Sequence, residues 1–537
     1  MPTDGVARDV SVQVSAREAA PDLVLVQAPI WGISTPPLAL AMLSAWVRQH
    51  GYRVRPVDLN VECYLARGAK YERLWELEES LLFWQSPSRV EEFILDFADL
   101  FEAFVASIAE ARPRAVGFTF YHSSCQISLH LAGLIKARAP ETTILAGGPH
   151  ASRYMAGRSM ALHPGIDVVV QGEGELALLE ILDRLRTGES VDDCPGTITK
   201  RDGVAVDHGD RAVMANLGAL PFPDFSDLDF SRYRDPFKLP MMSSRGCVNR
   251  CIFCNERPFW RGYRGMPAER IFAEIESQMA RYPQVDTIDF QDSAVNGNIR
   301  ELERFADLVI ASGRKIRWTG QAVIRREMTF ELASKLVQSG CSCLAFGLET
   351  ASTSLMRTIG KNAANGAAPE QVIKDCARAG LGCAYNFMFG LPGETDLDAQ
   401  NSMDLLRRCA REIGTVNPSP AFCGFCPGTL GFENPEKYGI DLTANPNYWR
   451  STDGTNTFLT RLARFEAFCS LVDDLKIPTT YRSRLLMDRE RAIANYHLVQ
   501  GNSEEAAKWF KEWLAREPND RSARARLDEC ERQLGAG

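Results

Sequence analysis

Three cysteines, Cys247, Cys251 and Cys254, form the group of side chains whose spacing says most about chemistry. They read C-x3-C-x-Phe-C, with Phe253 directly before the last cysteine. A structural zinc site usually takes four ligands, and a disulfide framework takes an even number of cysteines in an oxidising compartment. Three thiolates can instead hold three irons of a [4Fe–4S] cluster and leave the fourth iron open to a small molecule. The spacing therefore indicates an enzyme.

A zinc knuckle with a distant fourth ligand is the alternative explanation of the same cysteines. No second C-x2-C pair follows at the spacing that a zinc ribbon needs. The motif also comes directly after an apolar strand pattern at residues 241–244, which places it in a loop at the carboxyl end of a strand. Active sites of α/β barrels lie at that end. The placement favours a catalytic cluster.

The composition describes a globular protein of several domains. At about 150 residues per domain, 537 residues predict three or four domains, and 45% hydrophobic with 24% charged residues is ordinary for globular chains. A net charge of −8 argues against a general nucleic-acid binder. Residues 1–20 lack the apolar core of a signal peptide, and no apolar run reaches the roughly 18–20 residues of a membrane span. Fifteen cysteines, an odd number, fit a reducing compartment, so we expect a cytoplasmic protein.

Strand and helix patterns alternate through the first part of the chain. After a leader at residues 1–21, strands are expected at 23–27, 52–59, 115–120, 143–146 and 167–170, and a helix at 38–50 begins after two prolines. This alternation predicts a parallel, Rossmann-like sheet over residues 22–194, with ligands at the carboxyl ends of its strands. Residues 195–240 are rich in proline and are expected to connect two domains.

A second series of strands and helices is expected from residue 241. Its strands are predicted at 241–244, 287–291, 315–321, 344–349, 385–389 and 421–425, and six such repeats suggest a partial (β/α)6 barrel over residues 241–435. Residues 436–537 read as helical, and residues 492–534 have the spacing of a TPR-like helix pair. We interpret that pair as an interaction surface or a packing cap. The expected fold class is therefore α/β with a helical C-terminal region.

The cysteine motif, in this position, resembles that of the radical S-adenosylmethionine enzymes. Residues 346–350 resemble the GxES element of that family, residues 389–395 its GxPGET turn, and residues 426–429 its PGT turn. The resemblance implies that the three cysteines ligate a [4Fe–4S] cluster and that S-adenosylmethionine binds the open iron. It implies contacts to S-adenosylmethionine for six residues: Phe253, Asp292, Glu349, Thr350, Gly390 and Pro392.

Two positions depart from the family pattern. Relatives often carry paired acids where this chain has Gln291, Asp292 and Ser293, so Asp292 is the one carboxylate here that the resemblance assigns to the methionine amino group. The GxES element ends in Thr350, which keeps the hydroxyl of serine.

The first domain resembles the cobalamin-binding domains that precede some radical S-adenosylmethionine barrels. The similarity lies in residues 28–29, 36–40, 116–119, 145–150 and 170–175. It implies cobalamin contacts for seven residues: Thr119, Gly147, Gly148, Pro149, His150, Gly172 and Glu173. The D-x-H-x-x-G signature, whose histidine ligates cobalt, is absent, and His122 and His150 are candidates either for an axial or contact role or for ordinary surface or turn positions. A domain that keeps the fold without the cofactor is the other alternative.

The two resemblances cover about residues 22–435, and they include cobalamin-dependent methylases and an anaerobic magnesium-protoporphyrin cyclase-like branch. They imply an enzyme that uses the cluster, S-adenosylmethionine and cobalamin to methylate an unactivated carbon of a small-molecule or peptide substrate in secondary metabolism. An electron donor such as flavodoxin or ferredoxin, and a protein partner on the C-terminal helices, are expected. Two alternatives stay open: cyclisation, oxidation or rearrangement with the same cofactors, and a zinc-stabilised scaffold protein.

Overall fold

A computed structural model describes residues 20–84, 86–361, 368–443, 445–481 and 483–535. Residues 1–19 of the expected leader lie outside these ranges. The chain divides into two compact units, Met1–Pro240 and Met241–Gly537.

The first unit is built on a seven-stranded sheet with the order β2-β1-β3-β4-β5-β6-β7. Five parallel strands come first: β1 (Leu23–Gln27), β2 (Val54–Asp58), β3 (Ala115–Thr119), β4 (Thr143–Gly147) and β5 (Val168–Val170). Every residue of β1 is buried, as its continuous apolar sequence predicts. The expected parallel sheet is therefore present.

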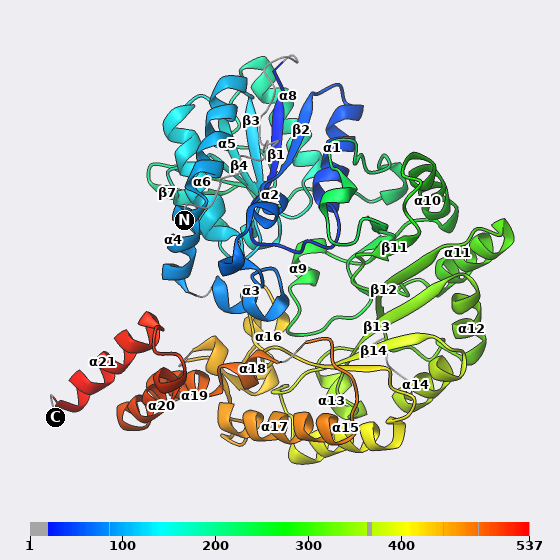
Figure 1. Ribbon diagram of the computed structural model, residues 1–537, viewed down its shortest axis with the longest axis vertical. Coiled ribbons are helices and arrows are strands. Elements are labelled where there is room, and N and C mark those ends of the chain that lie inside the picture. The colour runs from blue at the N-terminus through cyan, green and yellow to red at the C-terminus, as the bar shows by residue number, and fades with distance from the viewer. Residues whose placement is uncertain (1–19, 85, 362–367, 444, 482, 536–537) are drawn as a thin grey trace, which may run out of the picture. The chain divides into compact units, whose positions relative to one another are not determined.

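Helices cover both faces of this sheet. Figure 1 shows α5 (Ala98–Ala111) and α6 (Cys125–Arg138) on one side of the strands, and α1 (Leu38–Gln49) and α8 (Glu175–Thr187) on the other. The remaining helices of the unit are α2 (Leu59–Ala66), α3 (Leu77–Phe83), α4 (Pro87–Asp96) and α7 (Gly157–Leu162). Helices on both faces explain why the strands are buried on both sides.

The sheet continues past residue 194, where the sequence pattern was expected to end it. Strands β6 (Thr197–Arg201) and β7 (Val204–Asp207) add an antiparallel hairpin to β5. Asp202 and Gly203 form its turn, both with positive φ (51° and 78°), which is the geometry that an Asp-Gly pair favours between two strands. The expected connecting segment at 195–240 thus holds two strands of the first sheet, and the Asp-Gly pair was the signal for them.

A second sheet has six strands in the order β15-β14-β13-β12-β11-β8; all but β8, which begins before residue 241, lie wholly in the second unit. Its strands are β8 (Lys238–Met241), β11 (Thr287–Phe290), β12 (Arg317–Val323), β13 (Cys341–Glu349), β14 (Gly382–Phe387) and β15 (Thr415–Pro418). Strands β11 to β15 are parallel. A row of helices follows the strands along one face in Figure 1: α10 (Ala268–Arg281), α11 (Ile299–Ser312), α12 (Phe330–Gln338), α14 (Pro369–Arg378) and α15 (Asp396–Cys409).

The sixth strand was predicted at 421–425, and this position is wrong. The strand is β15, six residues earlier, and residues 421–425 form a loop whose Cys423 and Phe425 are buried. These two side chains pack with Ile252 and Trp449 in one apolar cluster. The apolar residues at 421–425 are therefore apolar because this loop is buried. A segment this short has no periodicity by which a buried loop could be told from a strand.

Short elements and a helical region complete the second unit. The short elements are β9 (Ser244–Arg245), α9 (Glu256–Trp260), β10 (Arg264–Gly265), α13 (Thr353–Thr358), α16 (Leu430–Glu433), β16 (Ile440–Asp441) and β17 (Arg450–Ser451). The C-terminal helices are α17 (Phe458–Asp474), α18 (Arg484–Met487), α19 (Arg489–Val499), α20 (Ser503–Arg516) and α21 (Arg521–Gly535). Helices α19 to α21 share a small core that includes Phe510, Trp513 and Leu527. Within the described part of the chain, no helix has both the length and the apolarity to cross a membrane.

Candidate functional site

The three motif cysteines lie in the loop between β9 and α9, and all three are partly exposed. Gly246 opens this loop with a φ of 75°, and a Cβ there would lie 2.2 Å from the carbonyl oxygen of Gly262. A glycine is required at this position on both grounds. The loop therefore begins with a bend that turns the cysteine segment back past residue 262.

Backbone hydrogen bonds from two distant segments hold the cysteine loop. The Arg250 N–H donates to the Gly360 carbonyl over 2.9 Å, and the Ile252 N–H donates to the Ile359 carbonyl over 3.0 Å. The Ile252 carbonyl accepts from the Gly431 N–H at 2.8 Å. The loop has no regular structure of its own, so these bonds fix its path from outside.

The motif thiols influence one another electrostatically. Burial raises the pKa of Cys251 to about 11 although the Lys361 ammonium opposes this, and burial raises the pKa of Cys254 to about 12. Cys247 contributes electrostatically to the rise in pKa at both residues. Thiols with raised pKa values bind iron by releasing protons, and metal binding is then strongly dependent on pH.

The three motif cysteines are compatible with the ligand set of an iron–sulfur cluster. Among the described residues, no three His, Cys, Asp or Glu side chains converge closely enough to hold one metal ion. In an iron–sulfur cluster each thiolate binds a different iron, so the sulfurs need not converge on one point. Three neighbouring thiols on one externally held loop meet that requirement.

Glu349 ends β13 in a strained conformation beside a buried lysine. Its φ is 66°, which is unusual for a residue with a side chain, and the strand register shifts between Gly347 and Glu349. Lys361 is 5% exposed; its Nζ donates to the Gly347 carbonyl over 2.6 Å and lies 3.4 Å from Glu349 Oε1. Burial lowers the pKa of Lys361, but the charges of Glu349, Cys251 and Cys247 outweigh it and raise the pKa.

Lys361 was not found from the sequence. It stands in a glycine-containing loop next to residues that read as surface, and such a lysine is nearly always exposed. Only the fold brings it under Gly347 and beside the cysteine loop.

Two of the residues expected to contact S-adenosylmethionine, Asp292 and Thr350, make hydrogen bonds within the protein through their side chains. Asp292 is buried, and its carboxylate accepts from the Ser243 N–H at 2.9 Å, the Ser243 hydroxyl at 2.7 Å and the Ser244 hydroxyl. Burial raises its pKa. The Thr350 hydroxyl is buried and accepts from the Ser352 N–H at 3.1 Å. Asp292 thus supports the segment just before the cysteine loop, and Thr350 supports the start of α13.

Phe253 and the turn at Gly390 and Pro392 are brought close together. Phe253 packs against the apolar cluster that contains Leu391, and Pro392 is buried. Gly390 has a φ of 74°, and its N–H donates to Glu394 Oε2 over 2.8 Å. The Met388 N–H donates to the Glu349 carbonyl over 3.0 Å, so the turn is joined to the end of β13. The cysteine loop, Glu349 and the turn are therefore brought together by contacts near the carboxyl ends of β13 and β14.

In the first unit, Thr119 and Gly147 end the adjacent strands β3 and β4. A Cβ at Gly147 would meet no atom within 4 Å, which leaves an open approach to the backbone there. The next residue, Gly148, has a φ of 93°, and Pro149 follows it at the exposed start of a short turn of helix. An open glycine at the carboxyl end of a parallel strand suits close approach by a large flat ligand.

His150 stacks on His122 with ring centroids 4.5 Å apart, and His122 contacts Trp84 at 4.0 Å. The Nδ1 atom of His150 is buried without a hydrogen-bond partner. Burial, reinforced by His122, lowers the pKa of His150 to about 4, and burial lowers the pKa of His122. Both rings are thus neutral near pH 7, and a buried ring nitrogen without a partner is compatible with a ligand next to it.

The other two expected cobalamin residues follow β5. Gly172 has a φ of 68°, and the Glu173 carboxylate accepts from the Met214 N–H at 3.1 Å, so Glu173 also supports the chain beyond the hairpin. Trp31 and Tyr121, after β1 and β3, were not predicted; their rings stack at 3.5 Å. No local spacing links two aromatic residues ninety positions apart.

Two family models match the chain. Residues 86–182 match the B12 binding domain, and residues 241–406 match the radical SAM superfamily. Among curated proteins, an uncharacterized methyltransferase of Pyrococcus horikoshii is 27% identical over 428 residues, covering 78% of this chain and 82% of the relative. The hopanoid C-3 methylase of Methylococcus capsulatus is 24% identical (58% and 53%), and the anaerobic magnesium-protoporphyrin IX monomethyl ester cyclase of Cereibacter sphaeroides is 25% identical (55% and 49%).

Among solved structures, TsrM and OxsB share the fold. TsrM, a radical S-adenosylmethionine methyltransferase of Kitasatospora setae with cobalamin and a [4Fe–4S] cluster bound, aligns with a TM-score of 0.61 at 17% identity, over 91% of this chain and 99% of TsrM. The cobalamin-dependent S-adenosylmethionine radical enzyme OxsB with aqua-cobalamin aligns with a TM-score of 0.63 at 14% identity, over 96% and 84%. The chain therefore carries a B12-binding domain ahead of a radical SAM domain, the combination that the sequence motifs led us to expect of a cobalamin-dependent radical S-adenosylmethionine enzyme.

Proposed function

We propose that this enzyme transfers a methyl group to an unactivated carbon of a small-molecule or peptide substrate. The observation that carries the proposal is the cysteine loop, which Ile359, Gly360 and Gly431 hold beside Glu349 and Lys361. Methyltransferases among the relatives support the choice of reaction.

The cluster site is assigned to Cys247, Cys251 and Cys254. Lys361 places a positive charge beside these thiols, which favours their ionised form when iron binds. We propose that S-adenosylmethionine binds against Phe253, which lies in the cysteine loop, and against Glu349, Gly390 and Pro392, which the contacts described above bring near it. We propose that Thr350 and Asp292 hold neighbouring segments of this binding site in place, since both side chains already accept hydrogen bonds from the protein backbone.

Cobalamin is proposed to bind at the carboxyl ends of β3, β4 and β5, against Thr119, Gly147, Gly148, Pro149, His150, Gly172 and Glu173. The open backbone at Gly147 and the buried, unpartnered Nδ1 of His150 support this assignment. When bound, the cluster supplies the electron that cleaves S-adenosylmethionine, and cobalamin carries the methyl group. The side chains of this chain position these groups and exclude water.

The finer architecture is proposed on the same basis. The six-stranded sheet, with its strands in sequence order and its helices on one face, supports a partial (β/α)6 barrel. Helices α19 to α21 pack in sequence order around one small core, which supports a TPR-like unit that could bind a protein partner. Fifteen free cysteines support a cytoplasmic location, where flavodoxin or ferredoxin would supply electrons.

The proposal is tested with protein reconstituted anaerobically with iron, sulfide and cobalamin. It is incubated with a reductant and S-adenosylmethionine that carries a trideuterated methyl group. We expect labelled methyl on the bound cobalamin by mass spectrometry, and a gain of one CH2 (CD3 for H when labelled) in any accepted substrate. Labelled methyl that never reaches cobalamin would contradict methyl transfer.

Cyclisation is the second candidate function, because anaerobic magnesium-protoporphyrin cyclases are among the relatives. A cyclase would consume S-adenosylmethionine and change its substrate without adding a carbon. The mass of the product therefore separates the two candidates.

A further inference from the structure

The turn at residues 389–395 contacts a segment that lies beyond the radical SAM match, which ends at residue 406. Resting on the function proposed above, we propose that Arg461 and Asn456 are positioning residues that fix this turn for S-adenosylmethionine.

Arg461 is a fully buried side chain near the start of α17. Its guanidinium carbon lies 3.6 Å from the centroid of the Trp449 ring, its Nε donates to Asn456 Oδ1 over 3.0 Å, and its Nη2 donates to the Asn456 carbonyl over 3.0 Å. Its Nη1 is buried without a hydrogen-bond partner. The guanidinium is therefore held on three sides and has one unused donor.

Asn456 connects this guanidinium to the turn. The side chain is 1% exposed; its Oδ1 accepts from Arg461, and its Nδ2 donates to the Leu391 carbonyl over 3.1 Å. The two ends of one amide thus join Arg461 to the backbone between Gly390 and Pro392. Because the amide has a fixed donor end and a fixed acceptor end, it fixes the position of the turn relative to α17.

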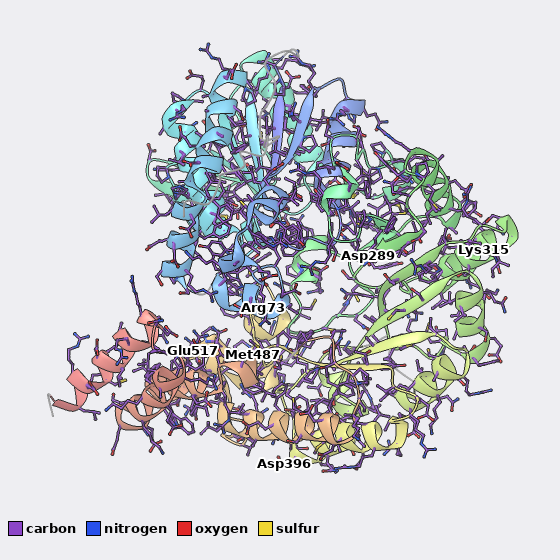
Figure 2. The ribbon with its side chains drawn as sticks, viewed as in Figure 1. Arg73, Asp289, Lys315, Asp396, Met487 and Glu517 are labelled. Carbon is purple, nitrogen blue, oxygen red and sulfur yellow. The ribbon has the colours of Figure 1, made fainter. Side chains whose placement is uncertain are left out.

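The turn is shaped to accept the arginine. A Cβ at Gly390 would lie 2.5 Å from Arg461 Cδ, so the side chain passes directly over this glycine. The Glu394 carboxyl group accepts from the Gly390 N–H and interacts electrostatically with Arg461. Arg464, one helical turn further along α17, donates to the Glu394 carbonyl over 3.0 Å and to Asp396 Oδ1 over 2.8 Å. Figure 2 labels Asp396 at the beginning of α15.

Stability alone does not explain a guanidinium in this place. A buried charge with an unmade hydrogen bond stabilises a fold poorly, and an apolar side chain of the same size is often as good or better. Its use is geometric, since the planar group holds one arrangement of Asn456 and Gly390. Gly390 and Pro392 belong to the turn assigned to S-adenosylmethionine, so fixing this turn prepares that binding site.

The test compares Arg461→Met, Arg461→Lys and Asn456→Asp with the exposed control Arg411→Met. The dissociation constant of S-adenosylmethionine is measured by anaerobic calorimetry on cluster-loaded protein without reductant, and thermal unfolding is measured on the same samples. We expect Arg461→Met to weaken binding about tenfold, which corresponds to one lost hydrogen bond, while the unfolding midpoint stays the same or rises. Arg461→Lys should recover part of the affinity, because it keeps the charge over Trp449.

Asn456→Asp keeps the acceptor for Arg461 and removes the donor to Leu391, so it tests the turn contact even if Arg461→Met does not fold. We expect a similar loss of affinity in this variant. Unchanged affinity in Asn456→Asp, or a parallel fall of affinity and unfolding midpoint in every variant, would overturn the proposal. Failure of the function proposed above is distinguishable from these results, because it would be seen in the wild-type protein as the absence of labelled methyl transfer.

Discussion

Lys361 Nζ lies 3.4 Å from Glu349 Oε1; the lysine is buried and the glutamate at the end of β13 is partly exposed. The lysine also donates to the Gly347 carbonyl, so it binds both sides of the register shift in β13. This pair joins the strained residue of the site to the thiols of the cluster loop.

We predict that Lys361→Met lowers the free energy of unfolding by about 2 kcal/mol, because it removes the donor to the Gly347 carbonyl and leaves the partly exposed Glu349 carboxylate without its counter-charge. Glu349→Gln in the same chain should restore part of this loss. Urea unfolding of the two single variants and the double variant measures the coupling between the residues. Additive effects of the two substitutions would show that the pair does not interact.

Cys247→Ala should remove iron binding and abolish the cleavage of S-adenosylmethionine, since two thiolates cannot replace three cluster ligands. Iron and sulfide analysis with chromatography of the nucleoside products checks this. Cys469→Ala is the matched control, because Cys469 is a buried free thiol in α17 away from the motif. Cleavage at the wild-type rate in Cys247→Ala would contradict the cluster assignment.

Gly147→Leu should weaken cobalamin binding at least about tenfold, because a leucine side chain would occupy the open approach to β4. Stability should change little, since a Cβ at this position meets no atom within 4 Å. Absorbance titration with cobalamin measures the affinity. Gly68→Leu, at an exposed position with equal space, is the control and should bind cobalamin as the wild type does.

Most strands of both units and the cluster loop could be predicted because their signals are local, although the strand expected at 241–244 lies at 238–241. Leu23–Gln27 is a continuous apolar run, and the three cysteines lie within eight residues. The hairpin after residue 194 was missed although its Asp-Gly turn is also local, and the sixth strand was misplaced because residues 421–425 are apolar for another reason.

The supporting residues of the site could not be predicted in the same way. Lys361 acts on residues 12 to 14 positions before it, and Asn456 acts on Leu391 from 65 positions away. Neither residue belongs to a spacing pattern, and a lysine or an asparagine in a loop is ordinarily exposed. Their roles follow from packing, which brings a donor to a carbonyl that no sequence window connects with it.

Glu394 gives a prediction for the dependence of stability on pH. Burial raises the pKa of this carboxyl to about 7, against the Gly390 N–H and the charges of Arg464 and Arg461, which lower it. Between about pH 4.5 and pH 7 the folded chain therefore holds a proton that the unfolded chain has lost. Stability from this group is present at low pH and is lost as pH rises through 7, because the folded state binds more protons over that window.

We therefore expect Glu394→Gln to gain stability relative to the wild type as the pH rises from 5 to 8, by at most about 3 kcal/mol. The glutamine keeps an oxygen for the Gly390 N–H, so the two proteins should differ little at pH 5. Urea unfolding at both values measures the difference, with Glu436→Gln as a control at an exposed glutamate. A difference between wild type and Glu394→Gln that is the same at pH 5 and pH 8 would show that Glu394 keeps one charge state in the folded chain over this range.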